Sequence, residues 1–121
     1  MAIYTGNDTV YLRKGDSGNI QVNGLPDDKN YAVYFSIVDD NGNIIKEWVV
    51  FSNYNTNVTF VLSASETDEL PPNDYTYGIK ICADGQEDTL IPRTTVENGT
   101  IKQYAAPTLT VGEKVVEGAT D

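Results

Sequence analysis

The chain contains no histidine, and this absence removes much of the chemistry that a protein of 121 residues could perform. Histidine is the commonest general base, the usual partner of a catalytic serine and the most frequent metal ligand. Any catalysis would therefore depend on serine, lysine, cysteine or carboxylate side chains acting without an imidazole. We do not expect an enzyme or a bound cofactor.

One short segment resembles a catalytic motif. Gly15-Asp16-Ser17-Gly18 matches the string around the nucleophile of chymotrypsin-like serine proteases, but Asn19 replaces the expected glycine. A triad is recognised by the roles of its members, and no imidazole exists here to accept the serine proton. Lys14 could activate Ser17 only in a desolvated pocket, which adjacent turn residues seldom supply. The string therefore predicts a hairpin turn.

Adjacent carboxylates are plentiful, and they lie beside Gly, Pro and Asn. Glycosidases need two carboxyl groups that face each other, which adjacency in sequence does not provide. The stretch from Asp39 to Asn43 is rich in oxygen ligands, but its glycine comes fourth rather than sixth, as an EF-hand loop requires. We interpret these segments as solvated turns, and a calcium ion held between loops remains open. The pairs are Asp27-Asp28, Asp39-Asp40, Asp68-Glu69 and Glu87-Asp88.

Eight basic and eighteen acidic residues give the chain a formal net charge of −10. A nucleic-acid backbone or an anionic lipid surface would repel such a chain, so neither is an expected partner. Cys82 is the only cysteine, which excludes an internal disulfide, and we interpret it as an inert thiol. We expect neither export nor membrane insertion, because the segment after Met1 is no secretory leader and no apolar run approaches about 20 residues.

The elements that position these residues are expected to be strands. Tyr31 to Val38 gives the strongest signal, because both of its alternating faces are largely apolar. This pattern indicates a central strand or one whose outer face meets a partner. Asn41-Gly42 then predicts a hairpin to a strand from about 44 to 51. Further strands are expected near 9–13, 20–22, 58–62, 75–81, 89–91, 94–97, 101–104 and 108–111.

The spacing of strands and turns predicts a single all-β domain, an immunoglobulin-like antiparallel β-sandwich of about seven to nine short strands. Ser65 and Asp68 loosely resemble a capping box, so we expect one short helical turn before Pro71-Pro72, where the chain crosses between the sheets. The sandwich should occupy residues 1–111. Residues 112–121 are then an acidic C-terminal arm or tail.

Surface aromatic residues provide the candidate interface. Alternation places Tyr11 and Tyr34 opposite the more apolar faces of their strands, and tyrosine is favoured where one end of the side chain stays wet. The C-terminal arm could order on contact with a partner. The candidate interface residues are Tyr11, Tyr34, Tyr104, Val115 and Val116.

Three segments resemble small virion domains of tailed bacteriophages, and the resemblance covers about residues 9 to 92. They are similar above all to the amino-terminal β-sandwich of the baseplate upper protein group and related head or tail accessory proteins. In that family a Gly-Asp turn opens the domain, and a proline-led Tyr-x-Tyr strand follows a helical turn. The segments are Arg13-Lys14-Gly15-Asp16-Ser17, Tyr31 to Ile37, and Leu70 to Ile81.

The resemblance implies a non-enzymatic structural or adaptor protein of the phage particle, made in the host cytoplasm and located in the virion. Its partners would be capsid, neck or tail proteins, or further copies of itself in a multimeric assembly. This sequence departs from the family at Asn73, where a glycine is usual, and lacks a long receptor-binding region downstream. No functional residue transfers. The alternative is a carbohydrate- or cell-surface-binding module, suggested by eight tyrosines and by loops rich in Asn and Asp.

Overall fold

The computed structural model describes residues 2–3, 9–92, 94–103 and 106–114. This part of the chain forms strands and one helical turn. The elements are β1 (Ala2–Ile3), β2 (Val10–Arg13), β3 (Gly18–Asn23), β4 (Ala32–Val38), β5 (Ile44–Phe51), β6 (Asn57–Leu62), α1 (Ala64–Thr67), β7 (Asn73–Ala83), β8 (Gln86–Ile91), β9 (Thr94–Glu97), β10 (Thr100–Gln103) and β11 (Thr108–Gly112).

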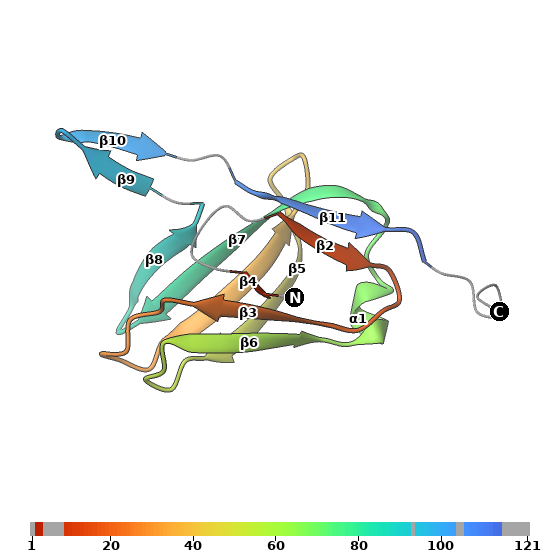
Figure 1. The fold of residues 1–121 in the computed structure, drawn as a ribbon, viewed down its shortest axis with the longest axis horizontal. Helices are drawn as coiled ribbons and strands as arrows, with labels where there is room; N and C mark the ends of the chain where they lie inside the picture. The colour runs from red at the N-terminus through yellow and green to blue at the C-terminus, as the bar shows by residue number, and fades with distance from the viewer. Residues whose placement is uncertain (1, 4–8, 93, 104–105, 115–121) are drawn as a thin grey trace.

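The strands form two facing sheets and a separate hairpin (Figure 1). The smaller sheet has the order β1-β3-β6. The larger sheet has the order β2-β11-β7-β4-β5, and β8 also pairs with β7. β11 and β8 follow one another along the same edge of β7, pairing with its first and last residues. The β9–β10 hairpin projects away from the sandwich (Figure 1).

Alternation of side chains places the core between the two sheets. In β4, Val33, Phe35 and Ile37 are fully buried, whereas the residues between them face outward and are half-buried. β6 shows the same period of two, with Val58, Phe60 and Leu62 buried. The other buried apolar residues are Val10, Leu12, Ile20, Val22, Leu25, Trp48, Leu70, Tyr75, Tyr77, Ile79, Ile81, Ile91, Leu109 and Val111.

Phe35 lies at the centre of this core. Its ring contacts Trp48 on β5 and Tyr77 on β7, with centroids 5.7 and 5.6 Å apart. On the opposite sheet it contacts Phe60, at 5.7 Å. These tilted contacts are typical of aromatic pairs in protein cores. One side chain therefore joins the middle of the larger sheet to the smaller one.

The expected all-β sandwich with one helical turn is confirmed, and β4 is the central strand that its two apolar faces indicated. The sheets are not purely antiparallel, however, because β1 pairs with β3 and β2 pairs with β11 in parallel. The described residues hold eleven strands, more than the seven to nine expected. The two-residue β1 carries no alternation that could have predicted it. No helix in the described residues is long and apolar enough to cross a membrane.

The turn at Gly15 and Asp16 is confirmed, but it is not a hairpin, because β2 and β3 belong to different sheets. Asp16 N donates to Arg13 O, and Gly15 adopts a left-handed conformation with a φ of 84°. The buried Thr67 fixes the turn: its hydroxyl accepts from Gly15 N and donates to Asp16 O. The turn is therefore a crossover anchored to α1.

The helical turn and the crossing between sheets are where the sequence indicated, but the capping box is two residues earlier than expected. Ser63 is the N-cap, its hydroxyl accepts from Glu66 N, and Glu66 Oε1 accepts from Ser63 N. Ser63-x-x-Glu66 fits the capping pattern better than Ser65-x-x-Asp68, because the longer Glu side chain reaches back to the cap.

Replacing Phe35 with Ala should lower the free energy of unfolding by about 3–5 kcal/mol, because a cavity forms where three other rings meet. Urea unfolding followed by tryptophan fluorescence measures this loss. Val61→Ala is the control, since Val61 is 68 % exposed and its truncation should cost less than about 0.5 kcal/mol. Similar losses in the two variants would contradict the placement of Phe35 at the centre.

Candidate functional site

Lys14 and Asp39, two of the residues that suggested catalysis or metal binding, have structural roles. Ser17 is exposed, whereas Lys14 Nζ donates to the backbone oxygens of Asp68 and Leu70. Asp39 Oδ1 accepts from Asn41 N and Asn43 N, both at 2.9 Å, which shapes the β4–β5 turn. Within the described ranges there is no pocket and no group of three potential metal ligands.

The most distinctive surface is the outer face of β4 and β5, where the two strands present apolar side chains in cross-strand pairs. We call this surface the β4–β5 face. Its register joins Ala32 to Phe51, Tyr34 to Val49, Ser36 to Glu47, and Val38 to Ile44. Neighbouring pairs of this kind lie close enough for their side chains to touch.

The apolar residues of the β4–β5 face are well exposed on β5. Phe51 is 67 % exposed, Ile44 is 58 % exposed and Val49 is 46 % exposed. Val49 and Phe51 are neighbours on this face, and exposed apolar side chains that gather on one face indicate an interaction site.

The inner face of β5 is anchored, and this fixes which residues point outward. Trp48 is buried against Phe35, and its Nε1 donates to Glu66 Oε2 at 2.9 Å. Because side chains alternate along a strand, Val49 must point away from the core. Lys46, which shares the parity of Trp48, pairs with Glu69 at 2.7 Å.

Polar groups lie both within and beside the β4–β5 face. Ser36 Oγ donates to Glu47 Oε2 at 2.7 Å, in the middle of the face. On the β7 side, Lys80 lies over the Tyr34 ring, 5.8 Å from its centroid, and pairs with Glu87 at 3.1 Å. The hydrogen bond from Lys80 to Glu87 raises the pKa of this lysine. The face is thus an apolar patch with one central carboxylate and a polar rim.

The structure separates the two predicted interface tyrosines. Tyr34 belongs to the β4–β5 face, whereas Tyr11 is on β2, three strands away in the sheet order. Tyr11 packs over Gly112, where a Cβ atom would clash with the tyrosine hydroxyl. The other candidates, Tyr104, Val115 and Val116, lie outside the described residues.

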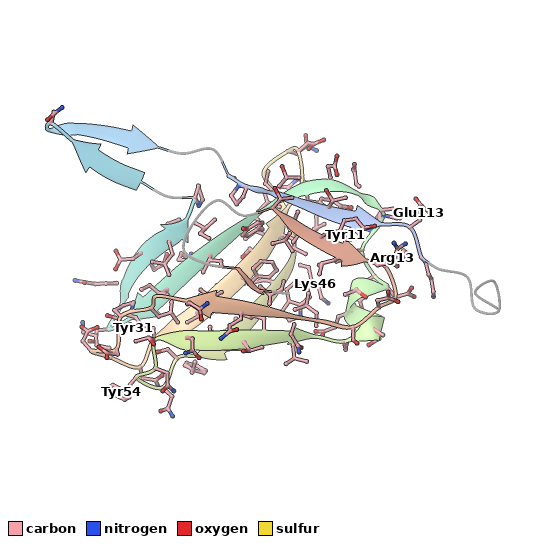
Figure 2. All side chains as sticks on the ribbon, viewed as in Figure 1. Tyr11, Arg13, Tyr31, Lys46, Tyr54 and Glu113 are labelled. Carbon is pink, nitrogen blue, oxygen red and sulfur yellow. The ribbon has the colours of Figure 1, made fainter. Side chains whose placement is uncertain are left out.

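The first residues of the predicted C-terminal arm contact the sandwich. Gly112 ends β11, and Arg13 Nη1 donates to Glu113 O at 3.0 Å (Figure 2). Lys114 pairs with Asp68 at 2.9 Å, and this contact lowers the pKa of the aspartate. The boundary at residue 112 stays a prediction, because residues 115–121 are outside the described part.

The opposite end of the sandwich carries an acidic group of loops, where Figure 2 shows Tyr31 and Tyr54. Tyr31 Oη donates to Asp28 at 2.7 Å. This bond, with smaller effects of burial and of Asp88 and Asp84, raises the pKa of Tyr31 to about 12. Tyr54 is 61 % exposed and adopts a left-handed φ of 63°.

Cationic side chains are all engaged in the part of the chain whose side chains are described. Four lysines pair with carboxylates, one lysine binds backbone oxygens, and the arginine binds the backbone at the arm and lies over Tyr11. In this part of the chain, no lysine or arginine side chain is left without a partner, so none is free to pair with the excess carboxylates. The ion pairs are Lys29–Asp84, Lys46–Glu69, Lys80–Glu87 and Lys114–Asp68.

Comparison with known proteins adds one finding. No family model matches the chain, and no curated protein matches it in sequence. Among solved structures, the chain is similar to the N-terminal domain of phage TP901-1 ORF48, with a TM-score of 0.50 and 14 % sequence identity. The match covers 94 % of this chain and 95 % of that chain.

The fold of the chain is similar to that of this phage protein domain. At 14 % identity the similarity shows the fold alone and assigns no functional residue. It agrees with the scaffold that the sequence resemblance implied, and it extends over almost the whole chain rather than the region from 9 to 92.

Sequence reasoning identified Tyr34 but missed the β5 half of the face. Apart from Lys46 and Glu47, the segment from Ile44 to Phe51 has apolar residues on both of its alternating faces, as β4 does. Applied to β5, that signal would have indicated a second apolar face, but not which of the two faces is exposed. The free edge of β5 could not be read from the sequence, because strand order is a long-range property.

Replacing Glu66 with Gln should lower the free energy of unfolding near pH 7 by about 1 kcal/mol, because Glu66 completes the cap and accepts from Trp48. The hydrogen bond from Ser63 N, above all, lowers the pKa of Glu66 below its ordinary 4.5. The stabilisation by the charged form is therefore present above about pH 4.5 and lost as the pH falls through the lowered pKa.

Urea unfolding of wild type and Glu66→Gln at several pH values tests this account. The difference between the two proteins should shrink on acidification, because protonated Glu66 resembles the amide. A difference that stays constant from about pH 7 to pH 3 would show that the charge of Glu66 does not contribute.

Proposed function

We propose that the protein is a non-enzymatic structural or adaptor component of a bacteriophage particle that acts through protein–protein contacts. The observation that carries the proposal is the β4–β5 face, an exposed apolar surface on a sandwich whose core is complete without it. The similarity of the fold to a phage protein domain supports the context. Capsid, neck or tail proteins, and further copies of the chain, are the proposed partners.

The composition of the face suits a protein interface. Phe51, Tyr34 and Val49 provide apolar contact area, and Lys80, Glu87 and Glu47 provide polar groups at the rim and the centre. Protein interfaces combine an apolar or aromatic centre with a polar, solvent-accessible rim. The proposed location is the virion, with synthesis in the cytoplasm of the bacterial host and an immunoglobulin-like sandwich as the scaffold.

Particles of a phage that encodes this chain should contain it in a fixed ratio to the capsid or tail proteins, as measured by quantitative mass spectrometry. Replacing both Val49 and Phe51 with Ser should reduce its incorporation at least about tenfold, because apolar contacts at an interface centre dominate binding. The free energy of unfolding should change by less than about 1 kcal/mol, since both side chains are exposed.

Val61→Ser is the matched control, because Val61 is as exposed as Phe51 but lies on the outer face of the other sheet. Its incorporation should equal that of the wild type. Absence of the wild-type chain from purified particles would contradict the proposed function. Normal incorporation of the Val49→Ser/Phe51→Ser variant would contradict the role of the face.

A carbohydrate-binding module is the second candidate, and one observation favours it. Tyr54 presents an exposed ring in the β5–β6 loop, flanked by the amides of Asn53 and Asn55. Aromatic rings with neighbouring polar groups can stack on and hydrogen-bond to a sugar.

Glycan-array binding should then be saturable and should fall at least about tenfold in Tyr54→Ala, because stacking on the ring is lost. Tyr11→Ala, at the other end of the sandwich, is the control and should bind as the wild type does. An array without saturable binding by the wild type would exclude this second candidate.

A further inference from the structure

The free edges of the larger sheet differ in how well they are protected against pairing with another strand. The edge formed by β8 presents the exposed polar residues 86–89, and β2 is only four residues long. β5 has eight residues, and apolar side chains occupy both of its faces. Natural edge strands are usually short, charged or covered. β5 is therefore the edge best suited to accept a strand from another protein.

The backbone groups of β5 that face its free edge can be assigned from the ladder. Ser52 N donates to Tyr31 O, so this position directs its backbone groups toward the β4 side. Because these directions alternate along a strand, Phe51, Val49 and Glu47 direct their N–H and C=O groups away from β4. No other strand in the described residues pairs with this edge.

The charges of β5 indicate what kind of strand fits. Glu47 lies between the apolar residues of the outer face, and the Ser36 hydroxyl is the one group among the described side chains that donates to its carboxylate. Lys46, the one cation of the strand, lies on the inner face with Trp48 and pairs with Glu69. A partner strand in register would gain from a cation beside Glu47 and from apolar side chains beside Val49 and Phe51.

A second copy of the chain fits this edge poorly. Two copies of β5 can pair symmetrically with their outer faces on the same side of the joined sheet. The residue opposite Glu47 of one copy is then Ile44, Glu47, Val49 or Phe51 of the other copy, and none of these is a cation. Each copy also carries a net charge of −10. Like charges across an interface are costly, whereas a basic partner is attracted.

We propose that the free edge of β5 binds an extended strand of a basic protein, with apolar residues beside Phe51 and Val49 and a Lys or Arg beside Glu47. The inference rests on the proposed function in one respect: the basic partner is taken to be a protein of the phage particle. The strand adds to the larger sheet by backbone hydrogen bonding, and its alternate side chains cover the β4–β5 face.

Selection from a displayed library of random peptides of about ten residues, with the full chain as bait, tests the proposal. Selected peptides should alternate apolar residues with Lys or Arg and should be depleted in Asp, Glu and Pro. Peptides without a cation, or the absence of any selected peptide, would overturn the proposal.

A charge reversal separates the site from bulk electrostatics. Glu47→Lys should invert the preference, so that Asp or Glu replaces Lys or Arg at the same peptide position. Asp74→Lys is the matched control, because Asp74 is an exposed carboxylate on β7 of the same sheet that accepts one hydroxyl bond, from Thr110 at 2.7 Å. Equal changes in the two variants would overturn the assignment to β5.

Val49→Pro removes an N–H that faces the edge and leaves the ladder to β4 intact, a position where proline is tolerated. It should weaken binding of the selected peptides at least about tenfold. Should the proline variant unfold, Phe51→Glu tests the same edge through an exposed side chain. Unchanged binding in the folded variants would overturn the proposal.

Sedimentation equilibrium of the wild type completes the test. A monomer supports the basic partner, whereas a dimer that Phe51→Glu dissociates would assign the edge to a second copy instead. These measurements use only the isolated chain. The binding experiments can fail although the chain is found in phage particles, and they can succeed although it is absent from particles. The proposed function and the proposed strand-binding edge are therefore tested separately.

Discussion

The burial of Phe35 between the two sheets is the constraint on which the rest of the structure depends. Its ring contacts Trp48 and Tyr77 within the larger sheet and Phe60 across the core. Trp48 is held from the other side by the hydrogen bond to Glu66, so the inner face of β5 is fixed. Since strand side chains alternate, fixing Trp48 inside places Val49 outside. The exposed face is thus a consequence of how the core is closed.

Local signals predicted much of the fold. The alternation in β4 indicated a central strand. Asn98-Gly99, both left-handed, joins β9 to β10, and an Asn-Gly pair is a local signal for a tight turn between two strands. The misplaced elements are those set by distant contacts. The local sequence after β2 predicts a hairpin, but β2 pairs in parallel with β11 instead. Pairing between segments so far apart in the chain has no local sequence signal.

The candidate site was less predictable than the fold. Tyr34 could be identified because its strand has a clearly more apolar opposite face, but Tyr11 satisfied the same rule and lies far from it in the sheet. Phe51 and Val49 were not distinguished from core residues, because an apolar residue at a strand position looks the same whether a sheet covers it or not. The packing of one sheet against the other decides that question, and it is a long-range property of the fold.

The central claim is that β5 is hydrogen-bonded to β4 along one edge, is held in the core by Trp48, and is free along its other edge. Residue-resolved amide hydrogen exchange of the isolated chain tests this most directly. The account predicts that the amides of Trp48 and Val50 exchange slowly, because they face β4, and that those of Val49 and Phe51 exchange rapidly. Slow exchange of Val49 and Phe51, equal to that of their neighbours, would contradict it by showing that the edge is already covered.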